Sequence, residues 1–500
     1  MSCRGLLAIV LLTLAAAGSR AAAQSEADAI GFGGDEPASG ENVPPPAASG
    51  SAADGGEAVQ AEMAAAPADE SSPWTFRTGL TLFGAIRLER DGPYRIGSAG
   101  QALDLALEYR QRLGEMVLRA QLAGHLESDF AYLINRANYD APTLELYGWQ
   151  LWVGESYLAL QWPVFELSVG TQIVNFGPGE MLGVLDVVNP RDVRNLFVAD
   201  PGDMRLPVLM TRAKLNLDRF RFELVVVHEP YFGLSAPPLG EFSPFRRLLL
   251  DDAALGPALA GHEMRLMHLP PRDLRELEAT QVHAFLSWSL PNVDLSLLAS
   301  SFLDPLGVPG FPEPSAWDNT SLEFPVLHPR FTLLGTAGAW TVGAFVLRWE
   351  AAFAIERPLA TRAPDTTLLM IREARSHVAT GLLGITWQPS FTTSAALEVS
   401  QSYVFQDLSL LFPIEATQIA VRFSQQFFSE RLTFSLLSLL IGVTTFNAWV
   451  GRAELSYALS DGLSVAIGYV TYQPSDRFGL FYGFDRNDRL FATLRTNAVH

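Results

Sequence analysis

The sequence predicts an all-β fold, a transmembrane antiparallel up-and-down β-barrel of about eighteen strands, with sixteen as the alternative. Apolar and polar residues alternate with a period of two through most of the chain after Trp74. Short turns and long loops also alternate along the chain, and an export signal precedes both features. A soluble β-sandwich would show the same alternation of residues, so the turns and the export signal favour the membrane barrel.

Residues 1–23 have the pattern of a secretory signal peptide. Residues 1–4 carry positive charge, residues 6–17 are apolar, and residues 21–23 form a small-residue cleavage site. The apolar stretch is shorter than the roughly 20 residues of a transmembrane helix, which disfavours the alternative of an uncleaved anchor. Because the only cysteine, Cys3, lies in this segment, the exported chain is expected to lack disulfides, zinc–thiolate sites and cysteine nucleophiles.

Residues 24–72 are predicted to be a disordered tail. The segment is rich in Ala, Gly, Pro, Ser and Glu, and it holds ten acidic residues but no lysine or arginine. Such a segment has too little apolar surface to offset the entropy of ordering, so a solvated spacer is favoured over a periplasmic binding segment. The whole chain has 54 acidic and 35 basic residues, a net charge of −19, which argues against a nucleic-acid partner.

Residues 73–500 are predicted to form the barrel itself. Residues 103–110 and 345–356 alternate between apolar and polar side chains, which point to opposite faces of a strand. An Arg or Lys side chain on the lipid face at mid-bilayer would cost about 2–4 kcal/mol, so the polar face is expected to surround a hydrated lumen. The residues predicted to line this lumen are Asp104, Glu108, Arg110, Arg119, Gln121, Arg212, Lys214, Glu223, Arg348, Glu350, Arg422, Arg452 and Glu454.

The spacing of turns gives the number of strands. Eight short turns join sixteen strands, and a first strand at 74–88 and a last at 489–496 complete eighteen. The turns are expected at residues 112–114, 161–163, 217–219, 290–292, 339–341, 388–390, 428–430 and 459–462. Longer connections are expected at 131–148, 177–206, 232–277, 304–329, 358–375, 406–415 and 474–486. Bacterial outer-membrane barrels have this asymmetry, which places both termini on the periplasmic, short-turn side.

Aromatic residues also gather near the ends of the expected strands. Trp149, Trp162, Trp387 and Tyr472 are examples. Aromatic girdles at both membrane interfaces are typical of transmembrane barrels, so these side chains are expected to face the lipid. A barrel of about eighteen strands is also wide enough to enclose a lumen rather than a packed core.

The loop at 177–206 is the most informative segment of the chain. The strand before it is expected to end at residues 177–179, where Pro and two glycines stop strand pairing. Asn189 is expected to cap a short helix that has Pro190 at its first position. We expect the loop to fold into the lumen as a constriction, with a solvated extracellular loop as the alternative. The residues expected at the constriction are Gln172, Asp186, Asn189, Arg191, Asp192 and Arg205.

A spaced set of glycine, amide, aspartate and proline residues runs through the same stretch. Its members are Gly170, Gln172, Phe176, Gly177, Asp186, Asn189, Pro190, Asp192 and Pro207. This pattern resembles that of a family of uncharacterised Gram-negative outer-membrane barrel proteins. The chain departs from the family at Thr171, where arginine is usual, and at Phe176, where tryptophan is common. The resemblance implies an outer-membrane location, traffic of small or lipid-like solutes, and periplasmic or inner-membrane transport partners, but no known reaction.

Motifs for catalysis are sparse, and no cofactor or metal is predicted. His262 and His268 are six residues apart, whereas a zinc-protease helix needs His-Glu-x-x-His, so a polar loop helix is the favoured interpretation. His125 and His283 fall on the polar face and leave a barrel-embedded lipid hydrolase as an alternative. A structural or partner-docking barrel that uses the acidic tail is a third. The leading hypothesis is an outer-membrane pore or transport channel.

Overall fold

A computed structural model of the chain describes residues 72–88, 96–198, 204–243, 245–250, 255–259, 261–269, 279–310, 321–362, 371–412, 414–443, 446–473 and 481–499. The expected signal peptide and all but the last residue of the expected tail lie outside these residues. Across the described ranges, no helix combines the length and the apolar character needed to cross a membrane.

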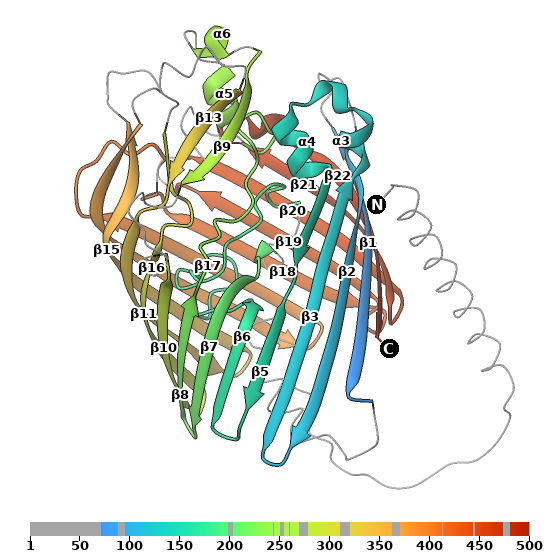
Figure 1. The fold of residues 1–500 in the computed structure, drawn as a ribbon, viewed down its shortest axis with the longest axis vertical. Helices are drawn as coiled ribbons and strands as arrows, with labels where there is room; N and C mark the ends of the chain where they lie inside the picture. Colours follow the sequence, from blue (N-terminus) through green and yellow to red (C-terminus); the bar gives the residue numbers. More distant parts are fainter. Residues whose placement is uncertain are drawn as a thin grey trace, which may run out of the picture. The chain divides into compact units, whose positions relative to one another are not determined.

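The wall of the fold is one antiparallel sheet that closes on itself (Figure 1). β1 pairs with both β2 and β22, so the last strand completes the ring. Its strands are β1 (Trp74–Arg87), β2 (Ile96–Leu113), β3 (Met116–Asp129), β4 (Trp149–Val153), β5 (Ser156–Gln161), β6 (Phe165–Gln172), β7 (Val208–Leu217), β8 (Phe220–Val227), β10 (Gln281–Leu290), β11 (Val293–Leu303), β14 (Arg330–Val342), β15 (Phe345–Arg362), β16 (Ile371–Ser390), β17 (Thr393–Val404), β18 (Gln418–Phe427), β19 (Leu432–Ile441), β20 (Ala448–Ser460), β21 (Leu463–Gln473) and β22 (Arg489–Val499).

The number of strands agrees with the sequence. The sheet contains 19 hydrogen-bonded segments, but β4 and β5 pair with successive parts of β3 and together make one interrupted strand. The barrel therefore has eighteen strands, which confirms the prediction. Arg77 near the start of β1 pairs with Val499 near the end of β22, and Trp74 pairs with Tyr109 beside the β2–β3 turn. Both ends of the barrel chain thus lie at the short-turn rim.

Most of the short turns fall where the alternation of residues breaks. The turn predicted at 339–341 lies instead at residues 343–344, because the ladder between β14 and β15 continues to the pair Val342 and Phe345. The turn predicted at 388–390 likewise lies at 391–392. A further connection, between Ile441 of β19 and Ala448 of β20, is not among the predicted ones.

Helices and a small sheet occupy the long-loop rim. The helices are α3 (Phe130–Ile134), η1 (Arg136–Asn138), α4 (Ala141–Tyr147), α5 (Phe245–Leu250), α6 (Leu255–Leu259) and η6 (Phe484–Arg486). β9 (Glu263–Leu269), β12 (Val308–Pro309) and β13 (Ser321–Leu327) form a separate three-stranded sheet. The helix expected around His262 and His268 is therefore wrong: Met264 and Leu266 alternate with polar neighbours and pack against Leu322, so this segment is a strand.

The outward face of the wall is largely apolar. Leu383 of β16 is 69% exposed and Ile467 of β21 is 58% exposed. Exposed aromatic side chains stand near the short turns, namely Trp74, Trp162, Trp288, Trp340 and Trp387. The prediction that Tyr472 faces the lipid is wrong. Its side chain is buried among Phe242, Phe481 and Phe484 on the inner side of the wall.

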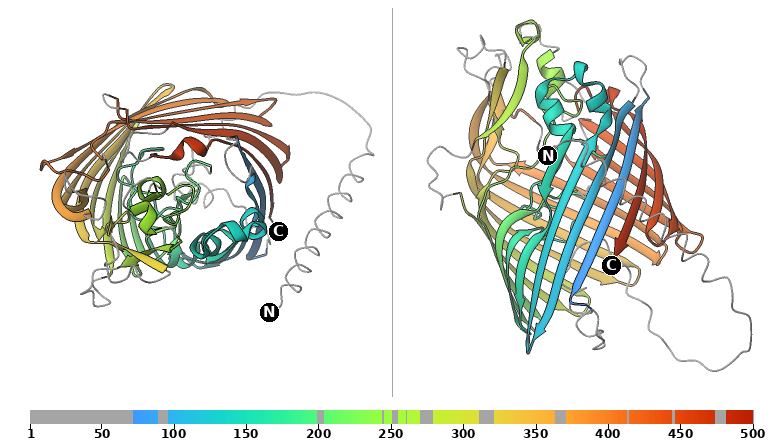
Figure 2. Two further views of the ribbon diagram at one scale, coloured as in Figure 1. Left: turned by 90° about the horizontal axis from the view of Figure 1, so that it is seen from above. Right: turned by 45° about the vertical axis from the view of Figure 1, so that its right-hand side comes forward.

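The largest apolar cluster joins the connection after β6 to the inner side of the wall. Val174, Phe176 and Leu185 of this connection are buried against inward residues of strands β7 to β17. The rings of Phe176 and Phe285 stack with centroids 4.6 Å apart. Figure 2, viewed from the long-loop rim, shows connecting segments inside the ring of strands. Because each fully buried large side chain contributes about 1.5–3 kcal/mol, this cluster fixes the connection to the wall.

Candidate functional site

Two carboxylates on the wall accept hydrogen bonds from the backbone of the connection after β6. Glu350 of β15 and Glu398 of β17 are each 1% exposed, and each accepts three backbone N–H groups at 2.6–3.0 Å. The donors are Gly179, Val184 and Leu185 for Glu350, and Glu180, Met181 and Leu182 for Glu398. Hydrogen bonds to an ionised carboxylate are stronger than neutral ones, so this contact holds the segment firmly.

The two carboxylates lie far from β6 around the barrel. Following the ladders from β6, β15 is the sixth strand along and β17 the eighth. In a ring of eighteen, the eighth strand is almost opposite. Arg348 of β15 adds an ion pair with Glu180 at 2.8 Å.

Glycine is required where the segment meets Glu350. Gly177 has a φ of +94°, and a β-carbon there would lie 2.5 Å from Glu350 Oε1. A β-carbon on Gly179 would lie 2.8 Å from the same oxygen. Gly177 and Gly179 therefore allow the backbone to approach the carboxylate, in addition to ending the strand.

Asn189 joins the two ends of the connection. Its side-chain oxygen accepts from the Val174 N–H at 2.7 Å, and its amide donates to the carbonyls of Gln172 and Leu206 at 2.9 and 2.8 Å. The expected helix after Asn189 is wrong, because this side chain bonds across to neighbouring segments rather than along its own chain. Gln172, Asn189 and Pro190 all belong to the motif described above. Pro190 begins an extended segment, where the sequence predicts a helix.

Residues 190–193 resume the path that β6 leaves. Arg191 forms a bridge with Arg205, and the Leu206 N–H donates to the Pro190 carbonyl at 2.8 Å. β6 pairs with β7 up to Gln172 and Val208, so 190–192 stands beside 204–206 as β6 stands beside β7. The residues between leave the wall and return to it.

Ion pairs fix the base of the connection. The Asp186 carboxylate forms ion pairs with Arg191 at 2.5 Å and with Arg205 at 2.9 Å, and its side chain is 2% exposed. Asp192 pairs with Arg194 at 2.6 Å. All six residues expected at the constriction therefore lie at or beside the base of this connection.

The sequence predicts that Arg194 pairs with a nearby aspartate, and the structure adds long-range contacts that the sequence does not reveal. Besides Asp192, its guanidinium binds Glu127 of β3 at 3.0 Å and the Leu146 carbonyl of α4 at 2.9 Å. Burial lowers the pKa of Arg194, but the hydrogen bonds and charges of Asp192 and Glu127 outweigh it and raise the pKa overall. Glu127 and Leu146 are too far away in sequence for local spacing to have identified them.

Most residues predicted to line the lumen take part in pairs along the wall. Glu108 pairs with Arg119 at 2.7 Å and also with Arg77. Arg212 pairs with Glu223 at 2.5 Å. Lys214 pairs with Glu166 at 3.1 Å, Arg452 with Glu454 at 2.6 Å, and Asp104 with His125 at 2.6 Å.

The remaining predicted residues are placed by their ladders. Gln121 donates to the Glu155 carbonyl at 3.1 Å, Arg110 stands opposite Arg119, and Arg422 stands opposite Ala396 and Leu437. Their contact with solute in a lumen stays a prediction. Glu350 is also predicted to line the lumen, but its carboxylate is buried and holds the backbone of the connection after β6.

The alternative of a lipid hydrolase would need an accessible Ser–His pair, and the Ser–His pair that the structure contains is buried. His283 Nδ1 lies 3.0 Å from Ser300 Oγ, but the two residues are 0% and 3% exposed, so a substrate has no access to them. His125 hydrogen-bonds to Asp104 and stacks on Trp152 at 4.1 Å. In the described part of the chain, His, Cys, Asp and Glu side chains form no group of three or more that could hold a metal.

Neither a protein-family model nor a curated protein matches the chain. Among solved structures, it is similar to Pseudomonas aeruginosa OpdK with vanillate (11% identity, 85% of this chain, 99% of that chain, TM-score 0.48). It is also similar to Pseudomonas aeruginosa OccK2 (OpdF) in complex with glucuronate (10%, 85%, 97%, 0.46) and to Salmonella typhi OmpF in complex with daunomycin (8%, 85%, 97%, 0.41). The resemblance to the uncharacterised outer-membrane family stays a prediction.

Proposed function

We propose that the protein is an outer-membrane channel for small or lipid-like solutes, whose lumen is narrowed by the connection 177–206. One observation carries this proposal: the backbone of residues 179–185 is held on Glu350 and Glu398, six and eight strands away from β6. A segment fixed across the inside of an eighteen-stranded ring reduces the cross-section open to solutes.

The location in the outer membrane is supported by the outward face. An apolar band with aromatic residues near the short turns suits lipid, and the paired charges lie on the other face of the strands. Short turns face the periplasm in bacterial barrels, so both ends of the barrel chain would be periplasmic. In this location the outward face of the barrel contacts outer-membrane lipid.

The class of solute has two separate supports. A narrowed lumen with paired charges of both signs favours small solutes without strong selection for one sign of ion. The resemblance to the uncharacterised outer-membrane family favours lipid-like solutes and transport partners in the periplasm or inner membrane. The proposal is of transport, with no reaction at the site.

Planar-bilayer recording tests the proposal. Replacing residues 178–187 by a short Gly-Ser linker removes the segment on Glu350 and Glu398 but keeps the Asn189 contacts. We expect the intact chain to conduct and the variant to conduct more, because the lumen widens. A matched linker at 363–370, between β15 and β16, should leave the conductance unchanged. If neither the intact chain nor the 178–187 variant conducts, the channel function is wrong.

A further inference from the structure

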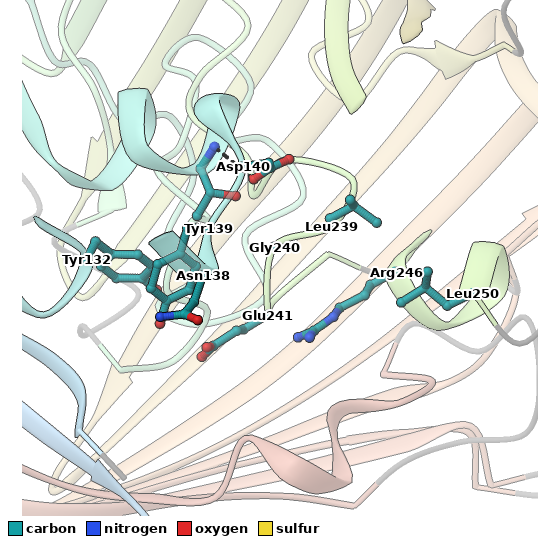
Figure 3. A pocket seen from close by; sticks show the side chains of 10 residues that line it. Tyr132, Asn138, Tyr139, Asp140, Leu239, Gly240, Glu241, Arg246 and Leu250 are labelled. Atoms are coloured by element: carbon teal, nitrogen blue, oxygen red, sulfur yellow. Dashed lines mark hydrogen bonds between the residues drawn. The ribbon is translucent and has the colours of Figure 1, made fainter. Parts of the chain in front are cut away.

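A cavity of about 240 Å³ lies between the β3–β4 connection on one side and residues 239–241 together with α5 on the other (Figure 3). One wall holds Tyr132, Asn138 and Tyr139, and the other holds Leu239, Arg246 and Leu250. Both segments belong to the long-loop rim, and α3, α4 and α5 lie within the ring of strands when viewed from that rim (Figure 2). The cavity therefore stands at the mouth of the barrel.

Arg246 supplies this cavity with an available positive charge. Its side chain is exposed on the cavity, and among the described residues its guanidinium has no hydrogen-bond or ion-pair partner. The surrounding protein lowers the pKa of Arg246, and the neighbouring charges of Arg247 and Arg486 lower it further. An anion bound here would relieve this repulsion.

Two acidic residues, Glu241 and Asp140, also line the cavity. Glu241 pairs with Arg87 of β1 and with Arg489 of β22, the latter at 3.3 Å, and its side chain is 10% exposed. Asp140 Oδ1 accepts the Thr143 N–H at 3.3 Å and caps α4, whereas Asp140 Oδ2 is buried and has no hydrogen-bond partner among the described residues. The carboxylates of Glu241 and Asp140 stand against Arg87, Arg489 and Arg246, so the described charges around the cavity sum to one positive charge although the whole chain is acidic.

The rest of the lining suits an apolar body. The rings of Tyr132 and Tyr139 lie 4.7 Å apart, and Tyr132 stacks in turn on Tyr147 at 4.6 Å. Leu239 and Leu250 add apolar surface across the cavity. An apolar cavity of about 150 Å³ holds one benzene ring, so this volume accommodates a single ring and a carboxylate.

We propose that this cavity binds a small organic acid, with its carboxylate on Arg246 and a single-ring apolar body between the tyrosine and leucine side chains. A guanidinium fork matches the geometry of a carboxylate. As a capture site for solutes that enter the lumen, the cavity rests on the proposed channel function, whereas the binding itself is independent of transport.

Equilibrium dialysis of the detergent-extracted full chain tests the binding. Benzoate is the probe, benzyl alcohol its neutral analogue, and inorganic phosphate the bare anion. We expect benzoate to bind, the other two to bind far more weakly, and Arg246→Gln to weaken benzoate binding by about tenfold or more, as loss of a charged hydrogen bond predicts. Arg375→Gln is the matched control, because Arg375 is exposed on β16 and pairs with Glu373 at 3.0 Å.

Three outcomes would overturn the proposal. Benzoate binding that is unchanged in Arg246→Gln excludes Arg246 as the anion site. Phosphate or benzyl alcohol binding as tightly as benzoate excludes an organic acid as the ligand. Arg246→Lys, a variant that retains the charge, should keep part of the affinity, and no binding in this variant when it still shows the heat-modifiable gel shift of a folded barrel contradicts the assignment. If the chain conducts but benzoate binding does not depend on Arg246, the binding site is refuted and the channel function stands. If benzoate binding depends on Arg246 but the chain does not conduct, the channel function is refuted and the binding site stands.

Discussion

At the scale of single residues, buried polar side chains organise the inside of the barrel. Asn189 satisfies one N–H and two carbonyls, and Glu350 and Glu398 satisfy three N–H groups each. A connecting segment that enters a barrel loses hydrogen bonds to water, so partners must come from side chains. This explains why amide and carboxylate residues stand at these positions.

Asn189→Ala should loosen the base of the connection. The variant leaves three buried backbone groups without this partner, at about 1–3 kcal/mol for each group that stays unsatisfied. We expect a lower temperature for the heat-modifiable gel shift and faster protease cleavage within 177–206. Asn135→Ala removes a single side-chain bond to the Ala131 carbonyl and should change neither. Equal behaviour of the two variants would refute the role of Asn189.

The pair His268 and His328 should make the small rim sheet sensitive to acid. His268 Nδ1 lies 2.9 Å from His328 Nε2, and His328 Nδ1 donates to the Asp304 carbonyl at 2.6 Å. Burial lowers the pKa of both rings, that of His328 to about 4. The unfolded segment then binds more protons than the folded one between about pH 6.5 and 4, so the sheet loses stability as the pH falls through this range.

Hydrogen exchange at two pH values checks this prediction. Backbone amides of β9 and β13 should exchange faster at pH 5 than at pH 7 after correction for intrinsic rates. His328→Gln should reduce the difference, because the glutamine does not titrate. Equal protection of β9 at both pH values in the unaltered chain would contradict the prediction.

At the scale of elements, the period of two predicts the wall but not what lies within it. The eighteen strands follow from alternation and turns, since each strand repeats a local rule. The contacts of Glu350 with Gly179 and of Arg194 with Glu127 join residues far apart in sequence, and local spacing does not contain them. The same limit explains β9, where a strand pairs with β13 rather than forming a helix.

Replacing Glu350 and Glu398 by glutamine should free the segment that they hold. An amide keeps one acceptor oxygen and loses the charge, so six charge-assisted bonds become fewer and weaker. We expect higher or more variable single-channel conductance in planar bilayers. Glu373→Gln on β16, whose partner Arg375 is exposed, is the matched control. Identical single-channel records for the double variant and the unaltered chain would show that the two carboxylates do not hold a constriction.

At the scale of the whole molecule, closure between β1 and β22 sets the orientation of the chain. The two strands pair along their length, and the first residues of β1 and the last residues of β22 lie together at the short-turn rim. If that rim is periplasmic, a peptide tag at the C-terminus is hidden in intact cells, whereas a tag within 363–370 is exposed. Antibody labelling of intact and permeabilised cells measures this directly. Labelling of the C-terminal tag in intact cells would reverse the proposed orientation.

The return of residues 190–193 to the path of β6 has a consequence for how such a protein changes over time. Because the chain rejoins its own ladder beside 204–206, the stretch between is an insert within one strand. Its length and chemistry can vary while every other ladder keeps its register. Substitutions, insertions and deletions within the insert therefore leave the pairing of the eighteen strands unchanged.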